Sequence, residues 1–121
     1  MADETSKGAG TPSQVQERLH EVARLLRDAK HLDKDARQAL ADLAEEIRTV
    51  FAATTVPSDE EVRLAQHASQ LIDALHRQHQ SNVVAAARDR LDEAVISAGS
   101  RSPLLAGLSR QLLDLLATLG I

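Results

Sequence analysis

The segment from Ser58 to Ala98 contains no glycine and no proline, and it constrains the fold more than any other feature of the chain. It opens with the pattern of a capping box, in which Ser58 stands three residues before Glu61 and acidic residues fill the first turn. One uninterrupted helix over 58–98 would be about 60 Å long at the usual rise per residue. No other helical segment of this chain could cover such a helix alone.

The apolar pattern of this segment changes phase near its middle. Apolar residues recur at three- and four-residue spacing on both sides, but every residue from His76 to Asn82 is polar. The pattern leaves two alternatives open. Either one long helix over 58–98 changes partners there, or two helices are separated by a break near Ser81–Asn82.

Three further helices are predicted from their start signals. Pro12 follows a threonine cap and begins a helix over 12–30; Asp33 caps a helix over 34–53. Ser102 and Pro103 begin a helix over 103–119. The short turn between the first two helices makes them an antiparallel helical hairpin.

The composition agrees with an all-α chain. Alanine, leucine, arginine, glutamate and glutamine favour helix, and no alternating run of β-branched residues predicts a strand. Aromatic residues make up only 1% of the chain and Phe51 is the sole one, so the core must be aliphatic. We therefore predict a helical bundle or coiled coil over residues 11–121 as one domain. The small, polar residues 1–10 are predicted to be a disordered leader.

The C-terminal helix carries more leucine than one core-facing surface needs. Its apolar arc is about twice the width that a helix with one buried face requires. If the helix over 58–98 is unbroken, half of it pairs only with this last helix, and two helices cannot bury so wide an arc. We therefore predict self-association through residues 83–121, as a homodimer or small oligomer. If the helix instead breaks near Ser81–Asn82, the alternative is a compact monomeric bundle. The predicted interface consists of Val84, Ala87, Leu91, Val95, Leu105, Leu108, Leu112, Leu115, Leu116 and Leu119.

The mid-chain histidines are the only candidate metal ligands. His76 and His79 have a spacing that could place two ligands on adjacent turns, and Asp73 precedes them. However, Asp73 and His79 lie about 240° apart around a helix, so the three side chains do not converge. We interpret them as a polar patch, with a small metal- or ligand-binding bundle as the alternative.

No other pattern indicates chemistry. The chain has no cysteine and no glycine-rich phosphate loop. Its serines are predicted to lie at helix caps or on polar helix faces, and none is predicted to act as a nucleophile. We expect no enzymatic activity, no catalytic residues and no cofactor.

Charge and hydropathy argue against two kinds of partner, nucleic acid and membranes. The net charge is −4 and lysine and arginine form no stripe, which argues against nucleic acid as a partner. No run of 18 apolar residues is present, and the last helix has a single arginine on its polar face, unlike helices that lie on membranes. The expected location is the cytoplasm.

Two segments together carry a family resemblance. The first is Leu32-Asp33-Lys34-Asp35-Ala36-Arg37, followed by Leu40, Leu43, Glu46 and Ile47; the second is Ser102-Pro103-Leu104, followed by Leu108, Leu112, Leu116 and Leu119-Gly120-Ile121. They resemble a family of short bacterial proteins grouped as a domain of unknown function, which open with a helical hairpin and end in a proline-led helix closing in Gly-Ile. The resemblance spans most of residues 14–121 and departs at Ser102, where the family has histidine before the proline.

The resemblance implies a helical, coiled-coil-like bacterial cytosolic protein and supplies no activity or site residue. The resulting prediction is a non-enzymatic interaction or assembly module, with itself or another protein as partner. An adaptor subunit of a larger bacterial complex is a further alternative.

Overall fold

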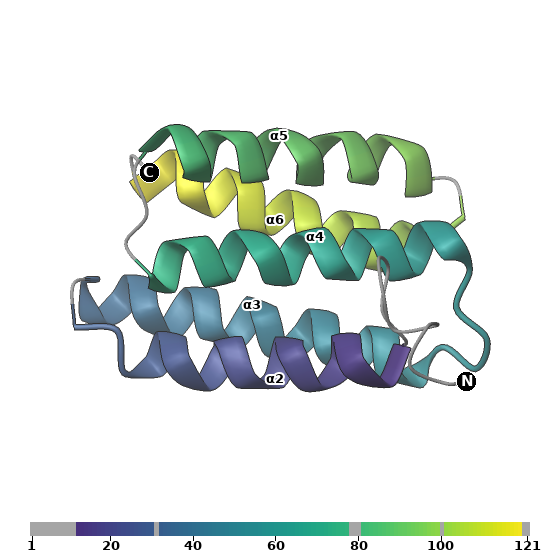
Figure 1. Ribbon diagram of the computed structural model, residues 1–121, viewed down its shortest axis with the longest axis horizontal. Coiled ribbons are helices and arrows are strands. Elements are labelled where there is room, and N and C mark those ends of the chain that lie inside the picture. Colours follow the sequence, from purple (N-terminus) through teal and green to yellow (C-terminus); the bar gives the residue numbers. More distant parts are fainter. Residues whose placement is uncertain (1–11, 31, 78–80, 100, 120–121) are drawn as a thin grey trace.

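The computed structural model describes residues 12–30, 32–77, 81–99 and 101–119, and the helices in them keep the labels of Figure 1. They are α2 (Pro12–Arg27), α3 (Lys34–Ala53), α4 (Asp59–His76), α5 (Ser81–Ala98) and α6 (Pro103–Leu119). Each helix runs antiparallel to the one before it (Figure 1). The described residues contain no strand, which confirms the all-α class.

The prediction of a single helix over 58–98 is wrong. The alternative with a break is correct, but the break precedes Ser81, and Ser81 and Asn82 belong to α5. α4 ends at His76 and α5 begins at Ser81, so the described chain has five helices and not four. The physical reason is burial. By folding back, the two halves place their apolar faces against each other, and both then contact α6.

The other predicted helices match the structure closely. α3 and α6 have the predicted bounds, and α2 ends three residues earlier than predicted. After Arg27 the chain forms a tighter, 3₁₀-type turn, in which Asp28 and Ala29 donate their backbone N–H groups to the carbonyls of Leu25 and Leu26, both at 3.1 Å. The predicted disordered leader, residues 1–10, lies outside the described residues, as does Gly120.

α4 is the helix that all the others contact. The contacts arrange α2, α4 and α5 in one layer and α3 and α6 in a second, with α4 touching both members of the second layer. Within the described ranges, α2 makes no contact with α5 or α6. The hairpins α2–α3 and α5–α6 are therefore joined through α4 and through the contact of α3 with α6.

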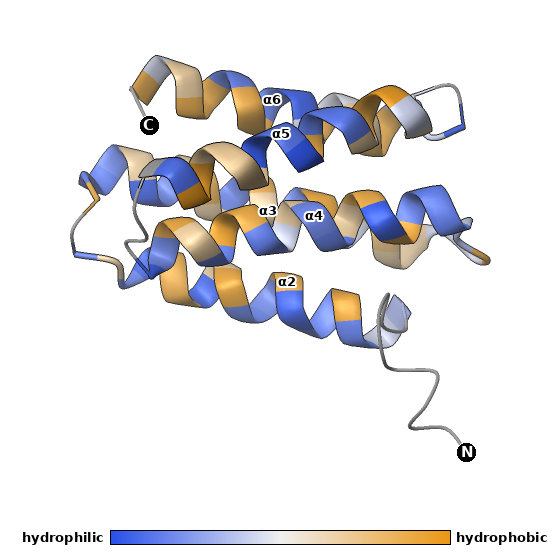
Figure 2. Ribbon diagram, turned by 45° about the horizontal axis from the view of Figure 1, so that its top comes forward, coloured by the Kyte–Doolittle hydropathy of each residue, from blue (hydrophilic) through white to orange (hydrophobic). Residues whose placement is uncertain are grey.

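One aliphatic core runs through the five helices. Apolar residues recur along every helix with polar ones between them (Figure 2), and their buried side chains form a single cluster. Each large apolar side chain that is fully buried stabilises the fold by about 1.5–3 kcal/mol. The largest of these are Phe51, Leu19, Leu26, Leu40, Ile47, Leu64, Leu71, Ile72, Leu91, Leu105, Leu112 and Leu116.

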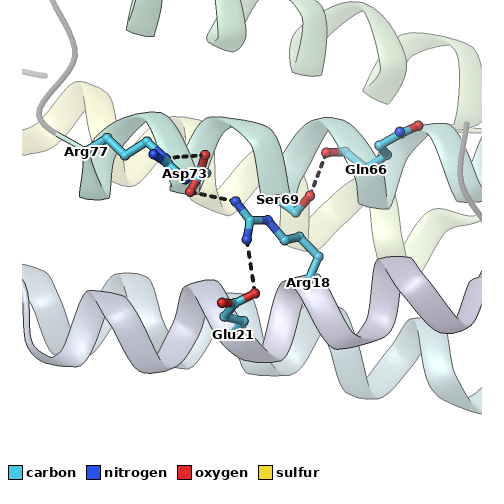
Figure 3. A network of polar contacts seen from close by, with 6 residues as sticks. All are labelled: Arg18, Glu21, Gln66, Ser69, Asp73 and Arg77. Atoms are coloured by element: carbon cyan, nitrogen blue, oxygen red, sulfur yellow. Dashed lines mark hydrogen bonds and ion pairs between the residues drawn. The ribbon is translucent and has the colours of Figure 1, made fainter. Parts of the chain in front are cut away.

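A polar network joins α2 to α4 at the edge of this core (Figure 3). Asp73 pairs with two arginines: its Oδ2 accepts a hydrogen bond from Arg77 Nε at 3.0 Å, and its Oδ1 forms an ion pair with Arg18 Nη2 at 2.9 Å. Arg18 also donates to Glu21 at 3.0 Å. The Asp73 side chain is only 21% exposed, so these pairs are better shielded than an ordinary surface ion pair.

A second network joins α2 to α3. Glu45 Oε1 accepts from Arg48 Nε at 2.8 Å, and Glu45 Oε2 lies 3.0 Å from His20 Nδ1. Burial raises the pKa of Glu45, but the hydrogen bonds from Arg48 and His20 and their charges outweigh burial and bring it below its ordinary value of 4.5. The sequence did not predict this pair, and the His20 side chain is exposed.

The start of α4 carries the predicted capping box. The Ser58 hydroxyl accepts from the Glu61 backbone N–H at 3.2 Å, and the Ser58 backbone N–H donates to the Glu61 carboxylate at 2.8 Å. The same carboxylate also accepts from the hydroxyl of Ser102, in the turn between α5 and α6. The cap of α4 is thus also a link to the α5–α6 turn.

This cap predicts a pH effect on stability. The pKa of Glu61 lies below 4.5, first because the Ser58 backbone N–H donates to it; burial opposes this, and the hydroxyls of Ser102 and Ser58 and the charge of Arg101 add to it. The folded chain therefore favours the carboxylate. The ionised Glu61 carboxylate stabilises the fold fully above pH 4.5, and this stabilisation is lost as the pH falls through the lowered pKa of the folded state.

Urea denaturation from neutral pH to about pH 3 tests this effect. We expect Glu61→Gln to be less stable than the wild type at neutral pH and to lose less stability on acidification. The amide keeps the shape of the side chain but has no proton to gain. If both proteins lose stability in parallel, the Glu61 carboxylate is not a source of acid sensitivity.

Candidate interaction surface

Most of the predicted interface residues lie inside the chain's own core. Of the ten, six are buried, three are partly buried and pack against the core, and one is exposed. The buried ones are Val84, Leu91, Val95, Leu105, Leu112 and Leu116; the partly buried ones are Ala87, Leu108 and Leu115; Leu119 is 37% exposed. The six buried positions are filled by intramolecular packing and do not form an open surface.

The C-terminal half does not lack helices to pack against, contrary to the expectation for an unbroken helix over 58–98. In that case α6 would pair with α5 alone. In the structure α6 also contacts α3 and α4, which cover the leucines on its inner side. The chain buries these leucines without a second copy because the chain reverses after His76.

α6 nevertheless has apolar residues on two adjacent stripes. The inner stripe is fully covered and includes Leu105, Leu112 and Leu116. The outer stripe lies beside the inner one around the helix. It consists of Leu104, Leu108, Leu115 and Leu119, spaced by four or seven residues. This second stripe accounts for the width of the apolar arc, and it is only partly covered.

Large exposed apolar side chains are concentrated on the same hairpin. Among the described residues five such side chains are exposed, and four of them belong to α5 or α6: Val83, Ile96, Leu104 and Leu119. Ile96 and Leu104 are the most open of the four, at 70% and 71%. The fifth, Val56, lies in the linker before α4.

The topology places these four side chains in two groups. Because α5 and α6 are antiparallel, Ile96 and Leu104 flank the short turn at one end of the hairpin, and Val83 and Leu119 lie at its other end (Figure 1). We call Val83, Ile96, Leu104 and Leu119 the hairpin patch. Scattered exposed aliphatic residues are common on proteins, so we take Ile96 and Leu104, the most open pair, as the centre of the candidate contact surface.

Gly107 lies on the exposed side of α6. A side-chain carbon added there would meet no atom within 4 Å. A glycine within a helix either lets another helix approach closely or lies at an exposed position. The structure supports the second interpretation, an exposed position, because no intramolecular contact requires the glycine.

The two halves of the chain also differ in charge. Residues 81–121 contain four arginines and four acidic residues, so they have no net charge, and the net charge of −4 resides in residues 1–80. One opposite pair bridges α5 and α6, with Arg110 Nη1 3.3 Å from Asp92 Oδ1. The hairpin patch is therefore set in a charge-balanced surface.

The histidines do not form a metal site in the described part of the chain. His79 lies outside the described residues, and no group of three or more described histidines, aspartates or glutamates is placed to hold a metal ion. Asp73 is bound by Arg18 and Arg77 and is not a free ligand. His76 is half-buried, and its Nδ1 has no hydrogen-bond partner.

None of the helices, in the parts described, has the length and apolar character needed to cross a membrane. The chain matches no protein-family model, no curated protein and no solved structure. The family resemblance stays a prediction.

The exposure of Gly107 predicts a stabilising substitution. Gly107→Ala should raise the free energy of unfolding by about 1 kcal/mol, because alanine has the higher helix propensity and its methyl group meets no neighbour. Thermal or urea unfolding at low protein concentration measures this gain.

Gly99→Ala is the matched control. A side-chain carbon at Gly99 would lie 3.2 Å from the backbone oxygen of Val95, which is tighter than ordinary contact. We expect no gain from this second change. Equal stabilisation by both substitutions, or a loss from Gly107→Ala, would show that the surroundings of Gly107 are not open.

Proposed function

We propose that this protein is a non-enzymatic helical assembly module that self-associates through the outer surface of α5 and α6. One observation carries the proposal: four of the five large apolar side chains exposed in the described residues lie on this hairpin. The sequence pointed to the same segment, residues 83–121, but to its core positions. The proposal moves the contact to the outer positions.

A second copy of the chain is the partner that the charges favour. Two copies of the charge-balanced hairpin can meet without net repulsion between them. In a twofold arrangement each exposed aliphatic residue is used twice. Burying Ile96 or Leu104 contributes on the order of 1 kcal/mol, because these side chains are 70% and 71% exposed in the single chain.

The experiment is light scattering on a sizing column across a concentration series. We expect a dimer or small oligomer whose mass falls on dilution. Leu104→Asp and Ile96→Asp should shift the equilibrium to monomer by about tenfold or more in Kd, because each places a charge in the contact. Both side chains are exposed, so the monomer should keep its fold.

Val56→Asp is the matched control, because Val56 is 83% exposed but lies outside α5 and α6. It should leave the mass unchanged. Leu112→Asp is not a test of assembly, since Leu112 is fully buried and a charge there should unfold the chain. A monomer at every concentration, or a mass unaffected by Leu104→Asp and Ile96→Asp, would contradict the proposal and favour an adaptor role with a different protein.

A further inference from the structure

A hollow lined by cations lies where α2 ends and α3 begins. It has a volume of about 230 Å³, and the described residues that line it are Arg27, Lys34, Arg37 and Gln38. Three of the four are positively charged, and no described carboxylate lines the hollow. This concentration is opposite in sign to the chain as a whole, which has a net charge of −4.

The position of two of these cations is unfavourable without a ligand. Lys34 and Arg37 stand in the first turns of α3, at the positive end of the helix dipole, where anions are stabilised and cations are not. The N-cap, Asp33, offsets part of this charge, but its carboxylate already accepts from the Asp35 backbone N–H at 3.2 Å.

The Arg37 guanidinium is incompletely paired. Its Nη1 donates to the carbonyl of Arg27 over a long 3.5 Å, and its Nε is buried and has no hydrogen-bond partner. Buried charged donors are normally paired, because leaving them unpaired forfeits their hydration. Nε is closed to solvent, so an acceptor in the hollow would engage the Nη groups of Arg37, of which Nη1 has only this long contact.

Nearby carboxylates do not provide this acceptor among the described residues. Arg27 Nη2 lies 3.6 Å from Asp42 Oδ1, which is a long contact between two exposed side chains. Among the described residues no ion pair joins Lys34 or Arg37 to an acid. Lys34 and Arg37 therefore have no direct carboxylate partner among the described residues, although Asp35 also stands in the first turn of α3.

We propose that this hollow is a binding site for a phosphate group. Arginine presents a fork of donors that matches the oxygens of an oxyanion, and lysine adds a point charge. Three cations around one hollow match a doubly charged phosphate better than a singly charged carboxylate. Gln38 adds an amide donor, and the start of α3 adds the positive end of its dipole. The site is separate from the hairpin patch and does not depend on self-association.

The test is titration of isotope-labelled protein with sodium phosphate, followed by amide NMR shifts at constant ionic strength. We expect saturable shifts centred on the amides of residues 34–38, and no saturable shift with sodium chloride or sodium acetate. Arg37→Gln should weaken phosphate binding about tenfold or more, the effect of losing charge-assisted hydrogen bonds. Without phosphate this variant should be no less stable than the wild type.

Two further variants make the result specific. Arg63→Gln removes the same charge from an exposed position on α4 and should leave phosphate binding unchanged. Asp42→Asn frees Arg27 from its carboxylate and should tighten binding. If Arg37→Gln does not fold, Lys34→Gln tests the same site. Shifts that follow ionic strength alone, that acetate reproduces, or that weaken equally in Arg63→Gln and Arg37→Gln would overturn the proposal.

Discussion

The structure depends on the burial of α4 between two helical hairpins. α4 contacts each of the other four helices, and its side chains Leu64, Leu71 and Ile72 are fully buried. An unbroken helix over 58–98 would leave about half of its apolar surface exposed, since no single hairpin is long enough to cover it. The reversal after His76 removes that exposure, and the free energy of burying aliphatic surface is sufficient reason for it.

Polar interactions fix how the helices meet around this core. Asp73 of α4 pairs with Arg18 of α2, and Glu45 of α3 pairs with His20 of α2. Glu61 connects the cap of α4 to the turn before α6. Each link is partly shielded and lies at the edge of the aliphatic core. With Phe51 as the only aromatic residue, the core offers few shapes that distinguish one helix register from another, and these links add specificity that Leu, Val and Ala alone supply less well.

The two surfaces of interest belong to different hairpins and have different chemistry. α5 and α6 carry exposed aliphatic side chains on a surface without net charge, which suits contact with another apolar surface. The turn between α2 and α3 gathers Arg27, Lys34 and Arg37 around a hollow. Self-association through the first surface leaves the second accessible, so the proposed module can assemble and bind a phosphate group at the same time.

The sequence by itself determined the all-α class and the bounds of α3 and α6, because caps, prolines and apolar spacing act over a few residues. It also identified Ser58 and Glu61 as a capping box. Only the tertiary structure decided that the segment over 58–98 folds back, because that choice depends on contacts between residues far apart in the chain. The same limit explains the candidate interface. Periodicity shows that Leu112 and Leu104 are both apolar positions of α6, but only packing against α3, α4 and α5 decides that Leu112 is buried and Leu104 exposed. The cationic hollow was likewise invisible in the sequence, since Arg27 and Arg37 become neighbours only when α2 and α3 pack antiparallel.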